Sequence, residues 1–95
     1  MDAVDEAVLQ RNLAFALTRP PGHHARYDQS MGFCIFNFAV GAAKYALDKY
    51  KLSRVAILDF DVHYGNGIAE LVADDVRIRW GYIIPRNIYY SCSFF

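Results

Sequence analysis

The chain has 95 residues, and its 10 basic and 10 acidic side chains cancel to a formal net charge of zero. A chain of this length holds at most one small domain. Hydrophobic residues make up 55% of it and charged residues 21%, which indicates a folded chain rather than a disordered one. Because there is no basic tail or stripe, nothing favours direct binding of nucleic acid through its phosphates.

No apolar run approaches the roughly 18 to 20 residues of a membrane span, so we expect no membrane association. The acidic start, residues 1–6, is unlike a secretory signal or a transit peptide. Cys34 and Cys92 form neither a CxxC pair nor a disulfide framework. Lone cysteines fit a reducing compartment, so we expect a cytoplasmic or nuclear location. The oligomeric state is not indicated.

The N-terminal third combines one helix with one apolar run. Residues 2–11 predict a short helix with a polar face. Residues 13–17 are continuously apolar and predict a buried strand. Pro20-Pro21-Gly22 would end this strand, because proline lacks a backbone donor and fixes φ. Residues 23–36 show no regular pattern.

Two helices and two further strands follow. Asn37 is a good cap for a helix over residues 38–51, where apolar side chains recur at helical spacing. Residues 54–58 predict a strand buried on both faces, as in a parallel sheet. A short helix over 68–73 and a strand over 76–80 complete the order βαβαβ. This order predicts an α/β fold with an open parallel sheet.

Chemistry-bearing residues follow two of these strands. Along a strand, residues i, i+2 and i+4 point the same way, so Asp59, Asp61 and His63 would converge on one side if the strand geometry persists. Carboxylate oxygen and imidazole nitrogen suit a zinc-like divalent ion. His23 and His24 follow the strand predicted over 13–17 and could act beside such a metal. Ligands of parallel sheets lie at these carboxyl ends.

Three segments, residues 19–25, 31–37 and 59–67, resemble in order and spacing the zinc-dependent histone deacetylase family. Related members act on acetylpolyamines or other acetylated amines. The resemblance implies the arginase/deacetylase fold, a parallel sheet between two layers of helices. We therefore expect residues 1–79 to be a partial deacetylase domain with part of this three-layer fold. Residues 80–95 form a divergent, aromatic-rich tail in this interpretation.

The resemblance also implies roles for five site residues. His24 matches the general base that activates water, and His23 matches its electrostatic partner. Asp59 matches the buried carboxylate that orients the first histidine. Asp61 and His63 match two of the family's three zinc ligands.

Further implied features are a second ion and a substrate channel. The Asp59 side chain and the backbone carbonyls of Asp61 and His63 match ligands of a structural potassium ion. Gly32 and Phe33 match the wall of a narrow tunnel that admits the acetyl-lysine side chain. The implied partner is an acetylated lysine on a protein or a small acetylated amine.

The chain departs from the family pattern in four ways. Tyr64 stands where the family usually has a histidine, and Asn66 where some members have an aspartate partner for the second active-site histidine. No residue matches the third zinc ligand, a later aspartate, or the catalytic tyrosine. We therefore expect a truncated deacetylase domain that is inactive by itself.

Two other functions remain open at this point. An apolar strand that ends in Asp59 and Asp61 is also typical of haloacid-dehalogenase-type phosphatases, where the first aspartate is the nucleophile and magnesium the cofactor. That alternative leaves the histidine loop without a role. The second alternative is a non-catalytic fragment or interaction protein. Cys34 is more typical of a small core residue than of a nucleophile.

Overall fold

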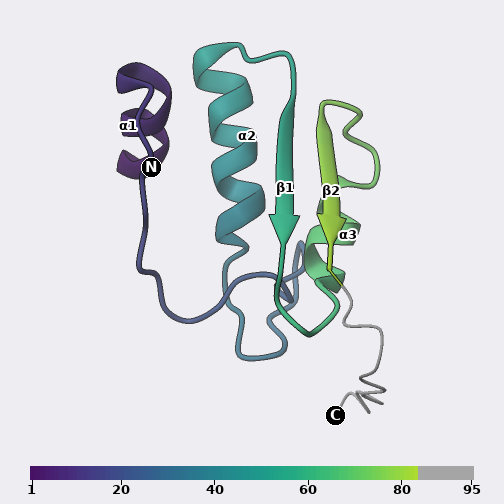
Figure 1. Ribbon diagram of the computed structural model, residues 1–95. Helices are drawn as coiled ribbons and strands as arrows, with labels where there is room; N and C mark the ends of the chain where they lie inside the picture. The colour runs from purple at the N-terminus through teal and green to yellow at the C-terminus, as the bar shows by residue number, and fades with distance from the viewer. Residues whose placement is uncertain (84–95) are drawn as a thin grey trace.

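The computed structural model describes residues 1–83 (Figure 1). The elements in chain order are α1 (Asp2–Gln10), α2 (Phe38–Tyr50), β1 (Val55–Asp59), α3 (Asn66–Val72) and β2 (Ile78–Tyr82). β1 and β2 pair in parallel, with Val55 opposite Ile78 and Asp59 opposite Tyr82. The predicted α/β class and parallel pairing are confirmed. No helix within residues 1–83 is long and apolar enough to cross a bilayer.

Helix α2 begins where the sequence predicts. The Asn37 side chain accepts a hydrogen bond from the backbone N–H of Val40 at 3.2 Å, which satisfies a donor that the helix itself cannot pair. Asn37 Nδ2 also donates to the Ala25 carbonyl at 3.1 Å. One side chain therefore starts the helix and fixes the segment that follows the two histidines.

The core lies on one face of the two-stranded sheet. Helices α2 and α3 contact each other and the strands, and their apolar side chains form one cluster with β2. The cluster consists of Val40, Ala43, Leu47, Ile68, Val72 and Ile78. The opposite face exposes Ala56 and Leu58. The expectation that residues 54–58 are buried on both faces is wrong, because both covering helices lie on one side; the described part has two layers.

The strand predicted over residues 13–17 is absent. The side chains of Leu13, Phe15 and Leu17 are 103%, 86% and 91% exposed. None of the backbone hydrogen bonds described for residues 1–83 involves this segment. An apolar run becomes a strand only beside a hydrogen-bonded neighbour, and the neighbour of β1 in the described part is β2. The predicted βαβαβ order is therefore reduced to two strands.

Helix α1 is held mainly by polar contacts. It has no buried residue, and its Asp5 carboxylate accepts hydrogen bonds from three side chains of α2. These donors are the Tyr50 hydroxyl at 2.5 Å, the Tyr45 hydroxyl at 3.0 Å and Lys49 Nζ at 3.0 Å. The bond from Tyr50 is the main reason that the pKa of Asp5 lies below its ordinary value.

The C-terminal boundary stays a prediction. β2 runs through residues 80–82, and most of the tail expected over 80–95 lies outside the described residues. Trp80 stacks on Tyr82 with ring centroids 5.0 Å apart. Tyr64 meets the edges of both rings, at 5.5 Å and 5.2 Å. Tyr64, one of the four departures, therefore packs on β2.

Candidate active site

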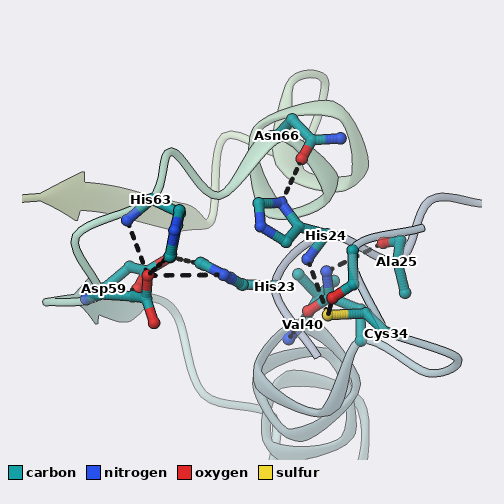
Figure 2. Close-up of polar contacts among 11 residues, drawn as sticks. His23, His24, Ala25, Cys34, Val40, Asp59, His63 and Asn66 are labelled. Atoms are coloured by element: carbon teal, nitrogen blue, oxygen red, sulfur yellow. Dashed lines mark hydrogen bonds and ion pairs between the residues drawn. The ribbon is translucent and has the colours of Figure 1, made fainter. Parts of the chain in front are cut away.

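Three segments meet at the carboxyl end of β1 (Figure 2). They are the histidine loop (residues 19–25), the loop after β1 (residues 60–65) and the start of α3. The backbone N–H of Ile68, in α3, donates to the His23 carbonyl at 3.2 Å. Gly67 is buried against the backbone of His24 and Ala25. Segments about 40 residues apart in the sequence are thus fixed together by backbone contacts.

His23 pairs with the carboxylate that ends β1. Its Nδ1 lies 2.8 Å from Asp59 Oδ2, and the side chains are 12% and 10% exposed. Because a carboxylate only accepts, Nδ1 carries the proton in this pair and Nε2 is left free. Nε2 lies 3.9 Å from Asp61 Oδ1. The other Asp59 oxygen accepts the backbone N–H of Asp61 at 3.1 Å, so both oxygens of Asp59 are used.

His24 pairs instead with a neutral side chain. Its Nδ1 lies 2.6 Å from Oδ1 of Asn66, the first residue of α3, as the dashed line in Figure 2 shows. The backbone N–H of His24 donates to Cys34 Sγ at 3.4 Å, and Cys34 is fully buried. Gly32 lies so close to the His24 ring that a Cβ at position 32 would overlap the ring. Asn66 and Gly32 therefore fix the ring, and Cys34 fixes the backbone of the same residue.

Asp61 and His63 lie beyond the end of β1, in the loop. Asp61 Oδ1 accepts from His63 Nδ1 at 2.8 Å and from the His63 backbone N–H at 2.7 Å. Both side chains are 48% exposed. Partial burial raises the pKa of the Asp61 carboxyl, but the hydrogen bonds from His63 outweigh it and leave this pKa below its ordinary value. The His63 ring centroid lies 6.2 Å from that of His24.

The donor pair fits part of a zinc site. Ligand atoms of a tetrahedral zinc lie about 3.4 Å from each other. The 2.8 Å between Asp61 Oδ1 and His63 Nδ1 is close to that value, so a small movement would turn both toward one cation. Within residues 1–83, no group of three His, Cys, Asp or Glu side chains is placed to hold a metal. The described residues supply two donors of such a site.

Gly65 and Gly67, to which the sequence pattern gave no site role, are required by the site. A Cβ at Gly65 would collide with Asp59 Oδ2 and approach His23 Nδ1. A Cβ at Gly67 would collide with the Ala25 carbonyl. These positions lie beside the histidine pair only after folding, so their spacing in the sequence carried no signal for this role.

The expected tunnel and potassium site are not tested by the structure. Gly32 and Phe33 have positive φ angles of 56° and 62°, and Phe33 is 91% exposed. An open hollow of about 410 Å³ borders His23, Asp59 and Asp61 but includes neither Gly32 nor Phe33. The tunnel wall therefore stays a prediction, as does the potassium site.

Comparisons with known proteins agree on one family. The family model of the histone deacetylase domain matches residues 1–83. A probable deacetylase of Methanothermobacter thermautotrophicus is 49% identical over 96 residues, which cover 99% of this chain and 29% of the relative. The polyamine deacetylase HDAC10 of Mus musculus is 47% identical over 80 residues, which cover 84% of this chain and 12% of the relative.

A solved structure has the same fold. The crystal structure of the HDA15 HD domain matches with a TM-score of 0.81 and 37% identity, covering 87% of this chain and 24% of that one. The expected resemblance and fold are thereby confirmed. The chain spans under a third of the length of each of these three proteins.

Proposed function

We propose, since the chain belongs to the histone deacetylase family, that its histidine pair and its Asp61–His63 pair serve zinc-dependent hydrolysis of an acetylated amine. One observation carries this proposal. Two imidazoles are fixed side by side, with ring centroids 4.1 Å apart, next to a carboxylate–imidazole pair suited to a metal. The activity, the substrate and the partners of the whole protein are all part of the proposal.

The two histidines have different proposed roles, because their hydrogen-bond partners differ. His24 is the general base: its Nδ1 faces Asn66, which leaves Nε2 free to take a proton from water. His23 is its electrostatic partner, oriented by Asp59. General base catalysis by such a group typically contributes about 10² to 10⁴ in rate.

Asp61 and His63 would hold the zinc ion. When bound, zinc supplies Lewis acidity that polarises the amide carbonyl and lowers the pKa of water. The chain's own contribution is to keep these donors beside the histidines, because the Asp61 backbone N–H is bonded to the same carboxylate that orients His23. A potassium ion near Asp59, Asp61 and His63 would stabilise this loop in the proposed domain.

The proposed substrate is an acetylated amine, either acetyl-lysine on a protein such as a histone or an acetylpolyamine. Gly32 and Phe33 would line its entry, since their turn lies against the His24 ring. The two substrate classes are distinguished by assaying an acetyl-lysine peptide and an acetylated polyamine in parallel. Chromatin regulation and a nuclear location would follow only from the first.

A chimera tests the proposal directly. Residues 1–83 replace the matching segment of the Methanothermobacter thermautotrophicus relative, and zinc-dependent release of acetate is measured on both substrates. We expect activity that falls by about 10² to 10⁴ in His24→Ala. Asp28→Asn is the matched control, because this exposed carboxylate lies outside the site. A folded, zinc-loaded chimera without activity would contradict the proposal.

The 95 residues by themselves are expected to show little or no turnover. Catalytic zinc sites normally have three protein ligands, and residues 1–83 supply two. Robust hydrolysis of an acetyl-lysine peptide by the purified chain, lost in His24→Ala, would overturn this expectation.

A non-catalytic interaction role is the second candidate. The exposed apolar side chains of Leu13, Phe15, Leu17 and Phe60 favour it, because such surface tends to be covered by other protein. Concentration-dependent association that persists in His24→Ala would support this role. The phosphatase alternative loses support, since both oxygens of Asp59 are hydrogen-bonded and the family is that of deacetylases.

A further inference from the structure

A thioether lies behind the partner of the proposed base. Asn66 Nδ2 is 3.2 Å from Met31 Sδ, while Asn66 Oδ1 is 2.6 Å from His24 Nδ1. Nothing in the sequence pattern assigns Met31 a role. The three side chains form a short chain of polar contacts, from sulfur through amide to imidazole.

The direction of each hydrogen bond in this chain follows from which atoms can donate and which can only accept. A thioether sulfur only accepts hydrogen bonds, so the NH₂ end of the Asn66 amide must be the donor to it. The carbonyl end is then turned to His24. Because that oxygen only accepts, His24 Nδ1 must donate, and the ring keeps its lone pair on Nε2. Without the sulfur, the amide could turn over and offer N–H to Nδ1, which favours the opposite tautomer.

The position of Met31 is itself tightly constrained. Its backbone exchanges two hydrogen bonds with Cys34, at 3.2 Å and 2.8 Å. The two residues between them, Gly32 and Phe33, have positive φ angles, as in a type I′ turn. Cys34 is 0% exposed and accepts the His24 backbone N–H. The same turn therefore holds both His24 and the sulfur that orients its partner.

We propose that Met31 is a positioning residue: its sulfur orients the Asn66 amide and thereby fixes the tautomer in which His24 can act as the base. This inference rests on the proposed function only for the role of His24 as base. An aspartate in place of Asn66 would accept from either oxygen and would need no such orientation. The sulfur matters because the partner of His24 is an amide.

Replacement of sulfur by a methylene group tests the proposal. The chain has two methionines, and Met1 is 61% exposed, so biosynthetic replacement by norleucine changes one site contact while side-chain length is kept. Selenomethionine is the matched control, because selenium still accepts. The ¹⁵N shifts of the His24 ring report the tautomer at about pH 8.5, where an ordinary imidazole is neutral. Met31→Leu repeats the change genetically.

We expect the proton to reside on Nδ1 in the native and selenomethionine proteins. In the norleucine protein, the tautomer ratio should shift about two- to tenfold toward Nε2–H, the range expected from one ordinary hydrogen bond. Asn66→Asp in the norleucine protein should restore the Nδ1–H form. An unchanged ratio in both the norleucine and the Met31→Leu proteins would overturn the role of Met31. The ¹⁵N measurement needs neither substrate nor zinc, so it tests the effect of Met31 on the His24 tautomer even where the deacetylase proposal fails.

Discussion

The two loops that bring imidazoles to the site are held in different ways. The His23 ring is 12% exposed and pairs with a carboxylate at the end of β1, while His24 is bonded to α3 and to a buried cysteine. The Asp61 and His63 side chains are each 48% exposed, and their shortest polar contacts are with each other. The first loop, which carries His23 and His24, is fixed by contacts with the folded core. The second loop, which carries Asp61 and His63, is held mainly by the contacts between these two side chains.

This difference indicates how the site is built. The proposed base is preorganised by contacts that form when the core folds, so it needs no ligand to be in place. The proposed metal donors have local order only, and a bound cation would be the contact that fixes them. Changes at the first loop should therefore affect folding, and changes at the second should affect metal binding alone.

The largest effect is expected from Gly67→Ala. Its new Cβ would collide with the Ala25 carbonyl, and backbone can yield only by moving α3 away from the histidine loop. We expect a loss of about 2 to 3 kcal/mol in the free energy of unfolding, measured by denaturant titration.

Gly41→Ala is the matched control for this prediction. A Cβ at this position in α2 meets nothing within 4 Å. Alanine should raise the stability by about 0.5 to 1 kcal/mol, because glycine is unfavourable inside a helix. Equal effects of the two substitutions would contradict the tight docking of α3 on the histidine loop.

Asp59→Asn should have the next largest effect. The amide accepts only through its oxygen, so it cannot accept from both His23 Nδ1–H and the Asp61 N–H as the two carboxylate oxygens do. Either one donor loses its partner, or His23 changes to the tautomer that accepts from the amide NH₂ group. We expect a loss of about 1 to 2 kcal/mol, again from denaturant titration. Asp74→Asn, at an exposed position, should change the stability by less than about 0.5 kcal/mol.

His63→Ala should separate metal binding from folding. The half-exposed ring is bonded only to its own loop, so stability should change by less than about 0.5 kcal/mol. Zinc affinity, measured by competition with a chromophoric chelator, should fall by about tenfold or more. A large loss of stability in this variant would remove the contrast between the two loops.

The smallest effect concerns pH. The pKa of Asp61 lies below 3.8, so its bonds to His63 stabilise the loop fully above that value and are lost as the pH falls through the lower, folded pKa. The ¹³C shift of the Asp61 carboxyl should therefore titrate with a midpoint below 3.8. In His63→Ala the midpoint should move up, since its main hydrogen-bond donors are weakened or lost. If the midpoint does not move in this variant, the hydrogen bonds from His63 are not the cause of the lowered pKa of Asp61.

Local signals predicted the helices well and the first strand badly. Asn37 and the apolar repeat that follows it predict α2 to within one residue of its end, because a cap and a helical face are encoded locally. The run over residues 13–17 has equally strand-like composition, yet it lies exposed. Strand formation depends on a neighbour that composition cannot reveal.

The site shows the same division. The histidines, Asp59 and the Asp61–His63 pair stand out in the sequence by residue type and by family resemblance, and the structure brings them together. The contacts made by Gly67 and Met31 arise only when α3 and the turn at residues 31–34 dock on the histidine loop. A glycine and a methionine gain positioning roles here only through tertiary contacts, and the spacing of residues along the sequence does not predict those contacts.

Cobalt titration followed by NMR is the sharpest test of a shared site for the histidine pair and the Asp61–His63 pair at the end of β1. Co²⁺ replaces zinc in sites with carboxylate and imidazole donors, and it broadens the resonances of nearby protons. We expect that the His63 ring protons broaden first, that those of the His23 and His24 rings follow, and that His63→Ala abolishes the broadening of the His23 and His24 rings. Broadening elsewhere, with the histidine pair unaffected, would contradict a shared site at the end of β1.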